Sequence, residues 1–430
     1  MNKIIKQKVF VGMSGGVDSS VSALLLQQQG YEVIGVFIKV WQPDLIECTW
    51  KNDRRDAMRV CATLNISFLT LDLQKEYTKE VIDYMLQEYK LGRTPNPDIF
   101  CNSQVKFGAF LQWALKNDAD FIATGHYSKI QIGRKEKKLF LQRAKDKSKD
   151  QAYFLWTLNQ KQLSKIIFPV GNLLKSEVRK IAEKNNLIVA HKKDSQGLCF
   201  IGQINFQDFL KKYLPSKNGK IVLLNAKNKK DNKKLPSQNN SFLRIEGHLR
   251  KFHSLLQTEE ENKKDNSLLG DKIIGQHDGV IFYTLGQKVL GYYVIKKDLQ
   301  KNILYVAPKD WETLESSNNS NLENILISTN PKDKTQKNKM ISQIILEKIN
   351  FNQKLEVNKI YEIENRYHAT SVLIKIKKII ENLVANKLEK DKKELTLELE
   401  ILNSEKIIFT SGQSLVFYEG DLLIGGGILK

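Results

Sequence analysis

The feature that most constrains the fold of this chain is a glycine-rich turn between an expected strand and an expected helix. Residues 8–12, KVFVG, predict a buried strand, and the apolar residues from Val17 to Leu25 recur at helical spacing. The turn between them can aim backbone N–H groups and the positive end of the helix at an anion. A strand, such a turn and a helix in this order indicate the start of an α/β sheet.

The alternation of strands and helices continues to about residue 204. Further strands are expected at 33–40, 67–73 and 120–125. Amphipathic helices are expected at 54–65, 79–90 and 175–187. We therefore predict a doubly wound parallel sheet over residues 1–204.

Beyond residue 204 the pattern changes to short β-like runs separated by glycine and charged residues. These runs include 219–224, 279–286, 292–298 and 302–307. Two smaller, mainly β domains are expected: a central one at 205–288 and a C-terminal β-barrel at 289–430. Segments 225–242 and 314–340, rich in Lys, Asn and Ser, are interpreted as surface insertions.

The chain is strongly basic, with a net charge of +20 from 68 Lys and Arg against 48 Asp and Glu. Such an excess attracts polyanions, usually nucleic acid, but the Lys/Asn-rich segments could equally supply the charge without forming a binding site. No apolar run approaches the roughly 18 residues of a membrane span. The first residues also lack the pattern of a signal peptide. We expect a cytoplasmic protein that does not contact membrane.

Four cysteines are present, Cys48, Cys61, Cys101 and Cys199, and their spacing forms no CxxC pair. We therefore expect neither a protein-built metal site nor, in a reducing cytosol, a structural disulfide. A cysteine with a function would act as a thiolate. Cys61 is interpreted as a packing residue, and the role of Cys48 stays open.

The glycine-rich turn contains Asp18 and lacks the lysine of the GxxxxGK[ST] phosphate-binding loop. A carboxylate beside phosphates is repelled unless a cation such as Mg²⁺ lies between them. This composition fits a loop that holds a pyrophosphate leaving group during attack on the α-phosphate of ATP. The alternative is a simple Gly/Ser turn with Asp18 as helix N-cap, which the strand–turn–helix setting disfavours.

A second group of reactive residues lies in GRTPNPDIFCN, residues 92–102. With Asp98 as the N-cap of a following helix, Cys101 would lie in the first turn, where the helix dipole lowers the pKa of a thiol. The alternative is an Asx turn with a buried cysteine.

Several motifs together carry a resemblance to a known family. They are SGGVDSS, TPNPDIFCN, ATGHY, KDQAYFL, DSQGLCFIG, GQHDGVIFYTLGQK, NRYHA and SGQSLVFYEGDLLIGGG, in this order along the chain. The chain resembles the bacterial tRNA-specific 2-thiouridylases, which are PP-loop ATP pyrophosphatases, over nearly its whole length. Lys288 replaces a usual arginine and Ser411 a usual proline, and neither change touches the expected chemistry.

The resemblance implies 2-thiolation of the wobble uridine of tRNA. ATP would adenylate the uracil 2-oxygen, and a persulfide on Cys199, loaded by a sulfur-donor protein such as a cysteine desulfurase or a relay carrier, would supply sulfur. Cys101 would complete the transfer, with release of AMP and pyrophosphate. The target uridine would have to leave its stack to reach the site.

The motifs also imply site residues. ATP would bind at Gly12, Met13, Ser14, Gly15, Gly16, Val17, Asp18, Ser19, Ile38 and Gly125. The target base would contact Asn96, Pro97 and Asp98, with Asp98 as an acid or base. Other contacts with tRNA would come from His126, Lys149, Asp150, Gln151, Arg366, Tyr367 and Gln413.

Two alternatives compete with this reading. Another PP-loop enzyme, such as an amide-forming synthetase or a tRNA lysidine synthetase, would share the ATP chemistry but needs no pair of thiols at Cys101 and Cys199. A basic RNA-binding protein with a relic nucleotide fold would be expected to have a degraded loop. The intact SGGVDSS and both cysteines disfavour these alternatives.

Overall fold

The structure is a computed structural model, and it describes residues 6–43, 50–133, 138–194, 206–224, 272–308, 341–386, 389–403, 407 and 409–430. Cys48 and Cys199 lie outside these residues, as do the insertions expected at 225–242 and 314–340. No helix in the described ranges combines the length and apolar character needed to cross a membrane.

The first domain is built on a five-stranded parallel sheet, which confirms the predicted fold class. Its strands, in spatial order, are β3 (Ser67–Asp72), β2 (Glu32–Lys39), β1 (Lys8–Gly12), β4 (Phe121–Ala123) and β7 (Ile166–Ile167). The strand order reverses direction between β1 and β4, each of which pairs in parallel with its neighbours. In doubly wound sheets, ligands bind beyond the carboxyl ends of the strands at such a switch point.

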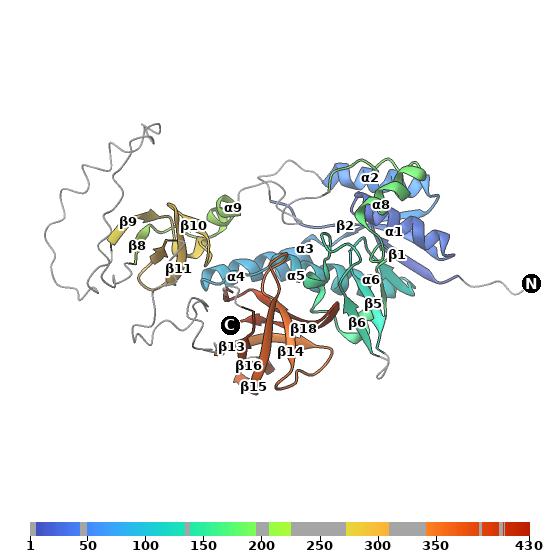
Figure 1. Ribbon diagram of the computed structural model, residues 1–430. Helices are drawn as coiled ribbons and strands as arrows, with labels where there is room; N and C mark the ends of the chain where they lie inside the picture. Colours follow the sequence, from blue (N-terminus) through green and yellow to red (C-terminus); the bar gives the residue numbers. More distant parts are fainter. Residues whose placement is uncertain are drawn as a thin grey trace, which may run out of the picture.

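Helices cover both faces of this sheet because alternate residues of β1 point in opposite directions. Val9 and Val11 pack with the helices α1 (Val17–Gln28), α2 (Trp50–Thr63) and α8 (Lys175–Lys184). Phe10 packs on the other face, where the helical segments between residues 74 and 116 lie (Figure 1).

The helical segments on that second face are not uniform α-helices. The first run consists of α3 (Gln74–Tyr77), a π-helical segment Thr78–Asp83 and α4 (Tyr84–Lys90). The second consists of α5 (Pro97–Phe100), a π-helical segment Cys101–Ala109 and α6 (Phe110–Lys116). Cys101 therefore lies at the junction of an α-helical turn and a π-helical segment, a kind of irregularity that is frequent at functional sites.

The central sheet contains strands from both sides of the boundary expected at residues 288 and 289. Its order is β10 (Lys288–Val289), β11 (Tyr292–Asp298), β12 (Ile303–Ala307), β8 (Gly219–Leu223) and β9 (Lys272–His277). Strand pairing thus places residues up to 307 in the central unit, because β12 pairs with β8. The run at 279–286 is not a strand: it starts at Gly279 with φ of 146° and continues as a 3₁₀ turn, Val280–Phe282.

The C-terminal domain is a closed barrel. Its strands are β13 (Ile341–Phe351), β16 (Glu389–Ile401), β15 (Val372–Asn386), β14 (Ile360–Glu364), β17 (Ser414–Glu419) and β18 (Leu422–Leu429). The barrel closes where β13 pairs with β18. Gly425 permits this closure, since a Cβ there would lie 2.4 Å from the carbonyl oxygen of Asn350.

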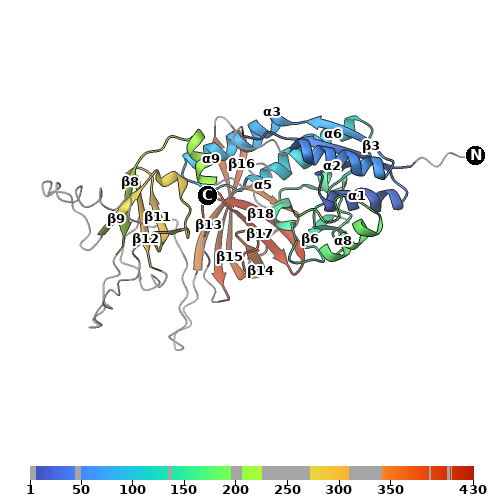
Figure 2. The same cartoon turned by 90° about the horizontal axis from the view of Figure 1, so that it is seen from above.

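The barrel and the first domain share one sheet. A hairpin of the first domain, β5 (Lys129–Ile132) and β6 (Leu139–Gln142), extends the barrel because β6 pairs with the start of β18. In Figure 2 the barrel lies directly against the first domain, and the central sheet lies at the opposite end from the N-terminus.

A partly buried arginine reinforces this connection. Arg143 follows β6, and its guanidinium lies 2.8 Å from Glu362 and 2.5 Å from Glu364, both on β14. The same group lies 3.8 Å from the ring centroid of Tyr418 on β17. Asp150 lies 3.9 Å from the same guanidinium, and only 13 % of the Arg143 side chain is exposed, so its removal would leave three carboxylates without their cation.

We expect Arg143→Met to lower the free energy of unfolding by about 3 kcal/mol, as is typical when one partner of a buried ion pair is removed. Lys147→Met is the matched control, because Lys147 pairs with Asp421 across the same interface but both side chains are more than half exposed. That control should cost about 0.5 kcal/mol or less. Urea unfolding followed by tryptophan fluorescence measures both. Equal effects would show that Arg143 does not hold the interface.

Candidate ATP and nucleic-acid site

The glycine-rich turn lies at the carboxyl end of β1 and leads into α1, as predicted. The backbone N–H of Met13 donates to the carbonyl of Val36, which continues the pairing with β2. Gly15 has φ of 74°, and a Cβ at this position would lie 2.3 Å from the carbonyl oxygen of Asp53. Gly16 is the N-cap of α1, so Asp18 lies within the first turn and is not the cap. The positive end of α1 therefore faces the turn.

Asp18 is held by two side chains that are distant in sequence. The hydroxyl of Tyr127 donates to Asp18 Oδ1 at 2.7 Å, and Lys175 Nζ lies 2.7 Å from both carboxylate oxygens. Burial is the main cause that raises the pKa of Tyr127, and the Asp18 charge adds to it. Tyr127 therefore acts as a hydrogen-bond donor to Asp18 at neutral pH.

A second lysine holds the turn itself. Lys192 Nζ lies 3.0 Å from the carbonyl oxygen of Gly15 and 2.8 Å from the carboxylates of Asp53 and Asp56. Both aspartates lie on α2, so Lys192 ties the turn to that helix. Its three N–H donors match these three acceptors.

Gly125 and Ile38 lie at the same edge of the sheet as the turn. Gly125 follows β4, and a Cβ there would lie 2.6 Å from the backbone nitrogen of Ser19. Ile38 is next to the last residue of β2. The residues expected to bind ATP are thus brought together at the switch point between β1 and β4.

The segment expected to contact the target base has a different cap from the one predicted. Asn96, not Asp98, is the N-cap of α5, because its side-chain oxygen accepts from the N–H of Asp98 at 3.1 Å. Pro97 occupies the first helical position. Cys101 is therefore at the end of the α-helical turn rather than in the first turn, and it is only 2 % exposed.

The barrel holds the residues that lead into this segment. The N–H of Thr94 donates to the carbonyl of Ser411 at 2.9 Å, and the Gln413 amide lies 3.4 Å from the carbonyl of Thr94. Gly412 has φ of 88°, and a Cβ there would lie 2.9 Å from the nitrogen of Thr94. Gln413, expected to contact tRNA, thus positions the segment that precedes Asn96.

The side chain of His126 is more enclosed than expected for a residue that contacts tRNA directly. Its ring packs against Phe107 and Phe168, with centroids 5.6 and 6.2 Å away, and Nδ1 lies 2.7 Å from Thr124 Oγ1. Burial, with a smaller effect of the Lys106 charge, lowers the pKa of His126 well below its usual value. The His126–Phe107 contact places the π-helical segment that starts at Cys101 beside the residue that follows Gly125.

The KDQ motif lies close to the ATP loop. Lys149 pairs with Asp194 at 2.7 Å, and Gln151 accepts from the N–H of Tyr127 at 3.0 Å. Asp194 also forms ion pairs with Lys175 and Arg179, each at 2.8 Å. Burial opposes ionisation, but the hydrogen bonds from Lys149 and Lys175 lower the pKa of Asp194 to about 2.

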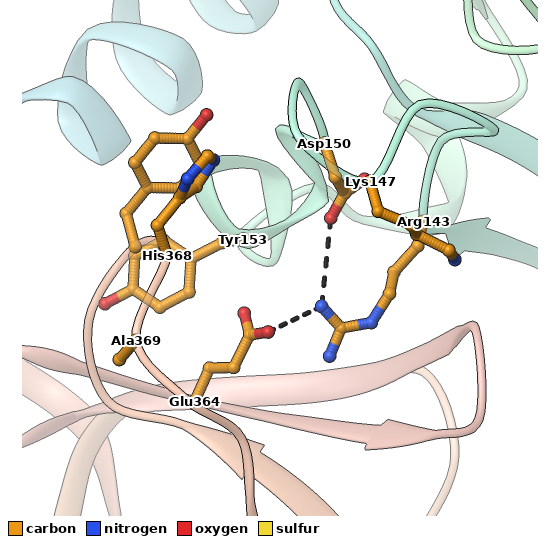
Figure 3. Close-up of a pocket in the computed structure, with 8 residues that line it drawn as sticks. Arg143, Lys147, Asp150, Tyr153, Glu364, His368 and Ala369 are labelled. Atoms are coloured by element: carbon orange, nitrogen blue, oxygen red, sulfur yellow. Dashed lines mark hydrogen bonds and ion pairs between the residues drawn. The ribbon is translucent and has the colours of Figure 1, made fainter. Parts of the chain in front are cut away.

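A cavity of about 240 Å³ lies between the first domain and the barrel (Figure 3). It is lined by Arg143, Lys147, Asp150, Tyr153, Glu364, Tyr367, His368 and Ala369. Burial raises the pKa of Asp150 to about 6. Burial, then the charges of Asp150 and Asp98, raises the pKa of Tyr367 to about 12.

Arg366 contacts the central domain. Its Nη2 donates to the carbonyl of Leu285 at 3.1 Å and lies 3.3 Å from Thr410 Oγ1. In this structure Arg366 joins the barrel to the central domain.

Sequence reasoning missed Lys175, Lys192 and Asp194. Asp194 belongs to the DSQGLCFIG motif, so its place there was a usable signal. Neither lysine belongs to any of the recognised motifs. Only the folding of the chain brings each of them next to the loop.

The fold and the loop define an α/β protein of the PP-loop class, with a HUP-type domain followed by two β domains. Family models support each part: the tRNA methyl transferase HUP domain at residues 7–203, the tRNA methyl transferase PRC-barrel domain at 259–308 and the aminomethyltransferase beta-barrel domain at 341–429.

Curated relatives give the family. The chain is 36% identical over 433 residues to tRNA-specific 2-thiouridylase MnmA from Oceanobacillus iheyensis, covering 98% of this chain and 94% of that protein. It is 45% identical over 316 residues to the MnmA of Christiangramia forsetii, covering 70% of this chain and 77% of that protein. The chain belongs to the family of tRNA-specific 2-thiouridylases, which confirms the resemblance seen in its motifs.

We expect Gly125→Ala to weaken nucleotide binding by about tenfold or more, which corresponds to about 1.4 kcal/mol. The added Cβ would collide with the backbone of Asp18 and Ser19 and displace the loop. Equilibrium titration with ATP measures this effect. Affinity for tRNA should stay unchanged, since this change touches only the loop. Unaltered ATP affinity would contradict the placement of the nucleotide here.

Proposed function

We propose that this protein catalyses ATP-dependent 2-thiolation of the wobble uridine of tRNA. The observation that carries the proposal is the position of two motifs at one edge of the first domain. Gly125 packs on Asp18 and Ser19 of the PP-loop, and the next residue, His126, packs on Phe107 of the π-helical segment that starts at Cys101. Membership of the 2-thiouridylase family supports the same activity.

The first step activates the uracil carbonyl. Its 2-oxygen bonds to the α-phosphorus of ATP, the N3 proton is lost and pyrophosphate leaves. An amide-like oxygen is a poor leaving group until it carries such an adenylate. Asp98 is proposed as the acid or base for this proton. Asn96 and Pro97, which set the helix start, would position Asp98 against the base.

The second step transfers sulfur. The terminal sulfur of a Cys199 persulfide bonds to C2, and AMP leaves with the former 2-oxygen. The Cys101 thiolate then attacks Sγ of Cys199 and breaks the persulfide bond, which leaves the sulfur on C2. The resulting Cys101–Cys199 disulfide is reduced by a cellular thiol before the next cycle. Cys199 lies outside the described residues, so its role rests on the DSQGLCFIG motif.

Mg²⁺ is proposed to bind with ATP. The described residues contain no group of three or more His, Cys, Asp or Glu side chains that could hold a metal. This fits Mg²⁺, which is commonly bound by one or two carboxylates together with substrate phosphates. Asp18 is the carboxylate proposed for this role, and the ion would neutralise charge on the leaving pyrophosphate.

The tRNA is proposed to bind across the first domain and the barrel, with further contacts from the central domain. Lys149, Asp150, Gln151 and Tyr367 lie around the cavity and the loop at this junction, whereas His126, Arg366 and Gln413 hold the elements that shape it. The other proposed partner is a sulfur-donor protein, and the proposed location is the cytoplasm. The domain limits proposed here are 1–204, 205–307 and the barrel that follows.

The loop composition predicts cleavage of ATP between the α- and β-phosphates. With tRNA and Mg²⁺, ATP labelled at the α-phosphate should give labelled AMP and an equal amount of pyrophosphate. Omission of tRNA is the control and should suppress the reaction, because the adenylate acceptor is then missing. Stoichiometric ADP and orthophosphate would contradict the PP-loop chemistry.

The two thiols should have separable roles. After incubation with a cysteine desulfurase and cysteine labelled with ³⁵S, label should appear on the wild type and on Cys101→Ser but not on Cys199→Ser. Both variants should bind tRNA and fail to form 2-thiouridine, measured by mass spectrometry of tRNA nucleosides.

Cys61→Ala is the control for the thiol experiment. Cys61 is buried on α2 against Gly35, and burial raises its pKa to about 12, so it is not a thiolate at neutral pH. This variant should thiolate tRNA normally. Label retained on Cys199→Ser would reverse the assigned roles, and full activity in either mutant would end the two-thiol mechanism.

A further inference from the structure

Lys175 occupies a position that helix electrostatics disfavour. It is the first residue of α8, where the positive end of the helix dipole repels a cation and where acidic residues are usually found. Its side chain is only 12 % exposed. A lysine placed here against local preference needs partners elsewhere in the fold.

Those partners are two carboxylates on either side of its ammonium group. Asp18 in the ATP loop contacts it through both oxygens at 2.7 Å, and Asp194 contacts it at 2.8 Å. Asp194 is also paired with Lys149 and Arg179. The carboxylate of Asp146 accepts from the backbone N–H of Lys175 at 2.9 Å, so three cations and three carboxylates lie together beside the loop.

We propose that Lys175 is the phosphate-binding cation that the PP-loop sequence itself lacks. The inference rests on the proposed use of ATP and adds to it the residue that holds the β- and γ-phosphates. A triphosphate seated at the N-terminus of α1 lies beside Asp18, because Asp18 is in the first turn of that helix. Lys175 is therefore already within reach of the phosphate position.

Binding of the nucleotide and its ion changes the contact between Asp18 and Lys175. An ion at Asp18 competes with Lys175 for the same two oxygens, and the negative phosphates attract the ammonium group. The flexible four-carbon stem of lysine allows the ammonium to move a short distance. Asp194 acts as a positioning residue, since it can keep one contact with Lys175 during this exchange.

The neighbouring Lys192 does not fit this role. Its donors are taken by the carbonyl of Gly15 and by Asp53 and Asp56, so it holds the shape of the loop. Movement of Lys192 toward a phosphate would release the loop backbone. The ammonium group of Lys175 contacts the carboxylates of Asp18 and Asp194, so its movement toward a phosphate would leave the loop backbone in place.

The test compares nucleotides that differ in their outer phosphates. Equilibrium binding of the full chain is measured with α,β-methylene-ATP and Mg²⁺, which cannot react, and separately with AMP. Lys175→Ala should weaken binding of the triphosphate analogue about tenfold, as expected for loss of one charge-assisted hydrogen bond. AMP binding should change by less than about twofold, because AMP lacks the outer phosphates.

Two further variants control for structural effects. Lys175→Arg should restore most of the affinity, because it keeps the charge. Lys180→Ala, an exposed lysine on the same helix, should bind both nucleotides like the wild type.

Equal loss of AMP and of the triphosphate analogue in Lys175→Ala would assign Lys175 a structural role and overturn the proposal. Unchanged affinity for both would overturn it as well. Failure of the proposed thiolation would appear separately, as ADP formation or as absence of 2-thiouridine in the wild type, and would not alter this binding comparison.

Discussion

The sharing of one sheet by the first domain and the barrel is the constraint on which the site depends. Strand β18 pairs with β17 and β13 inside the barrel and with β6 of the first domain. Because backbone hydrogen bonds join the two domains, the barrel cannot rotate without breaking them. The Ser411–Gln413 turn is therefore held at Thr94, and through it the segment that carries Asp98 and Cys101 keeps its place.

Charge is the second organising element, and it is concentrated where function is proposed. Arg143 lies among carboxylates at the barrel interface, and Lys175 and Lys192 lie among carboxylates at the ATP loop. Pairs of this kind gain little net stability, because desolvation opposes the Coulomb attraction. They do restrict geometry, since a lost partner leaves a costly isolated charge. The network thus fixes positions more than it adds to the free energy of folding.

Much of the first domain could be predicted because its signals are local. The strand β1, the turn and α1 follow from apolar periodicity and glycine, and the family motifs placed the loop and Gly125 at one edge. The cap at α5 was predicted at Asp98, although Pro97 already pointed to Asn96, since proline favours the first helical position. The sequence therefore contained the signal for the correct cap.

Other features depended on long-range contacts that no local pattern encodes. Lys175 lies 157 residues from Asp18 and Lys192 lies 177 residues from Gly15. The pairing of β12 with β8 depends on such a contact too, because a long stretch of sequence separates the two strands. Residues 279–286 have the composition of a strand, but Gly279 with its positive φ turns the chain instead.

The pairing of β6 with β18 also has a consequence for synthesis of the chain. The two strands are separated by about 280 residues, which takes roughly 15 to 60 seconds to translate at typical rates. During that interval the hairpin β5–β6 has emerged with one edge of β6 still open, and an open strand edge invites pairing with other chains. The nascent protein therefore needs its β6 edge to be shielded until β18 emerges from the ribosome.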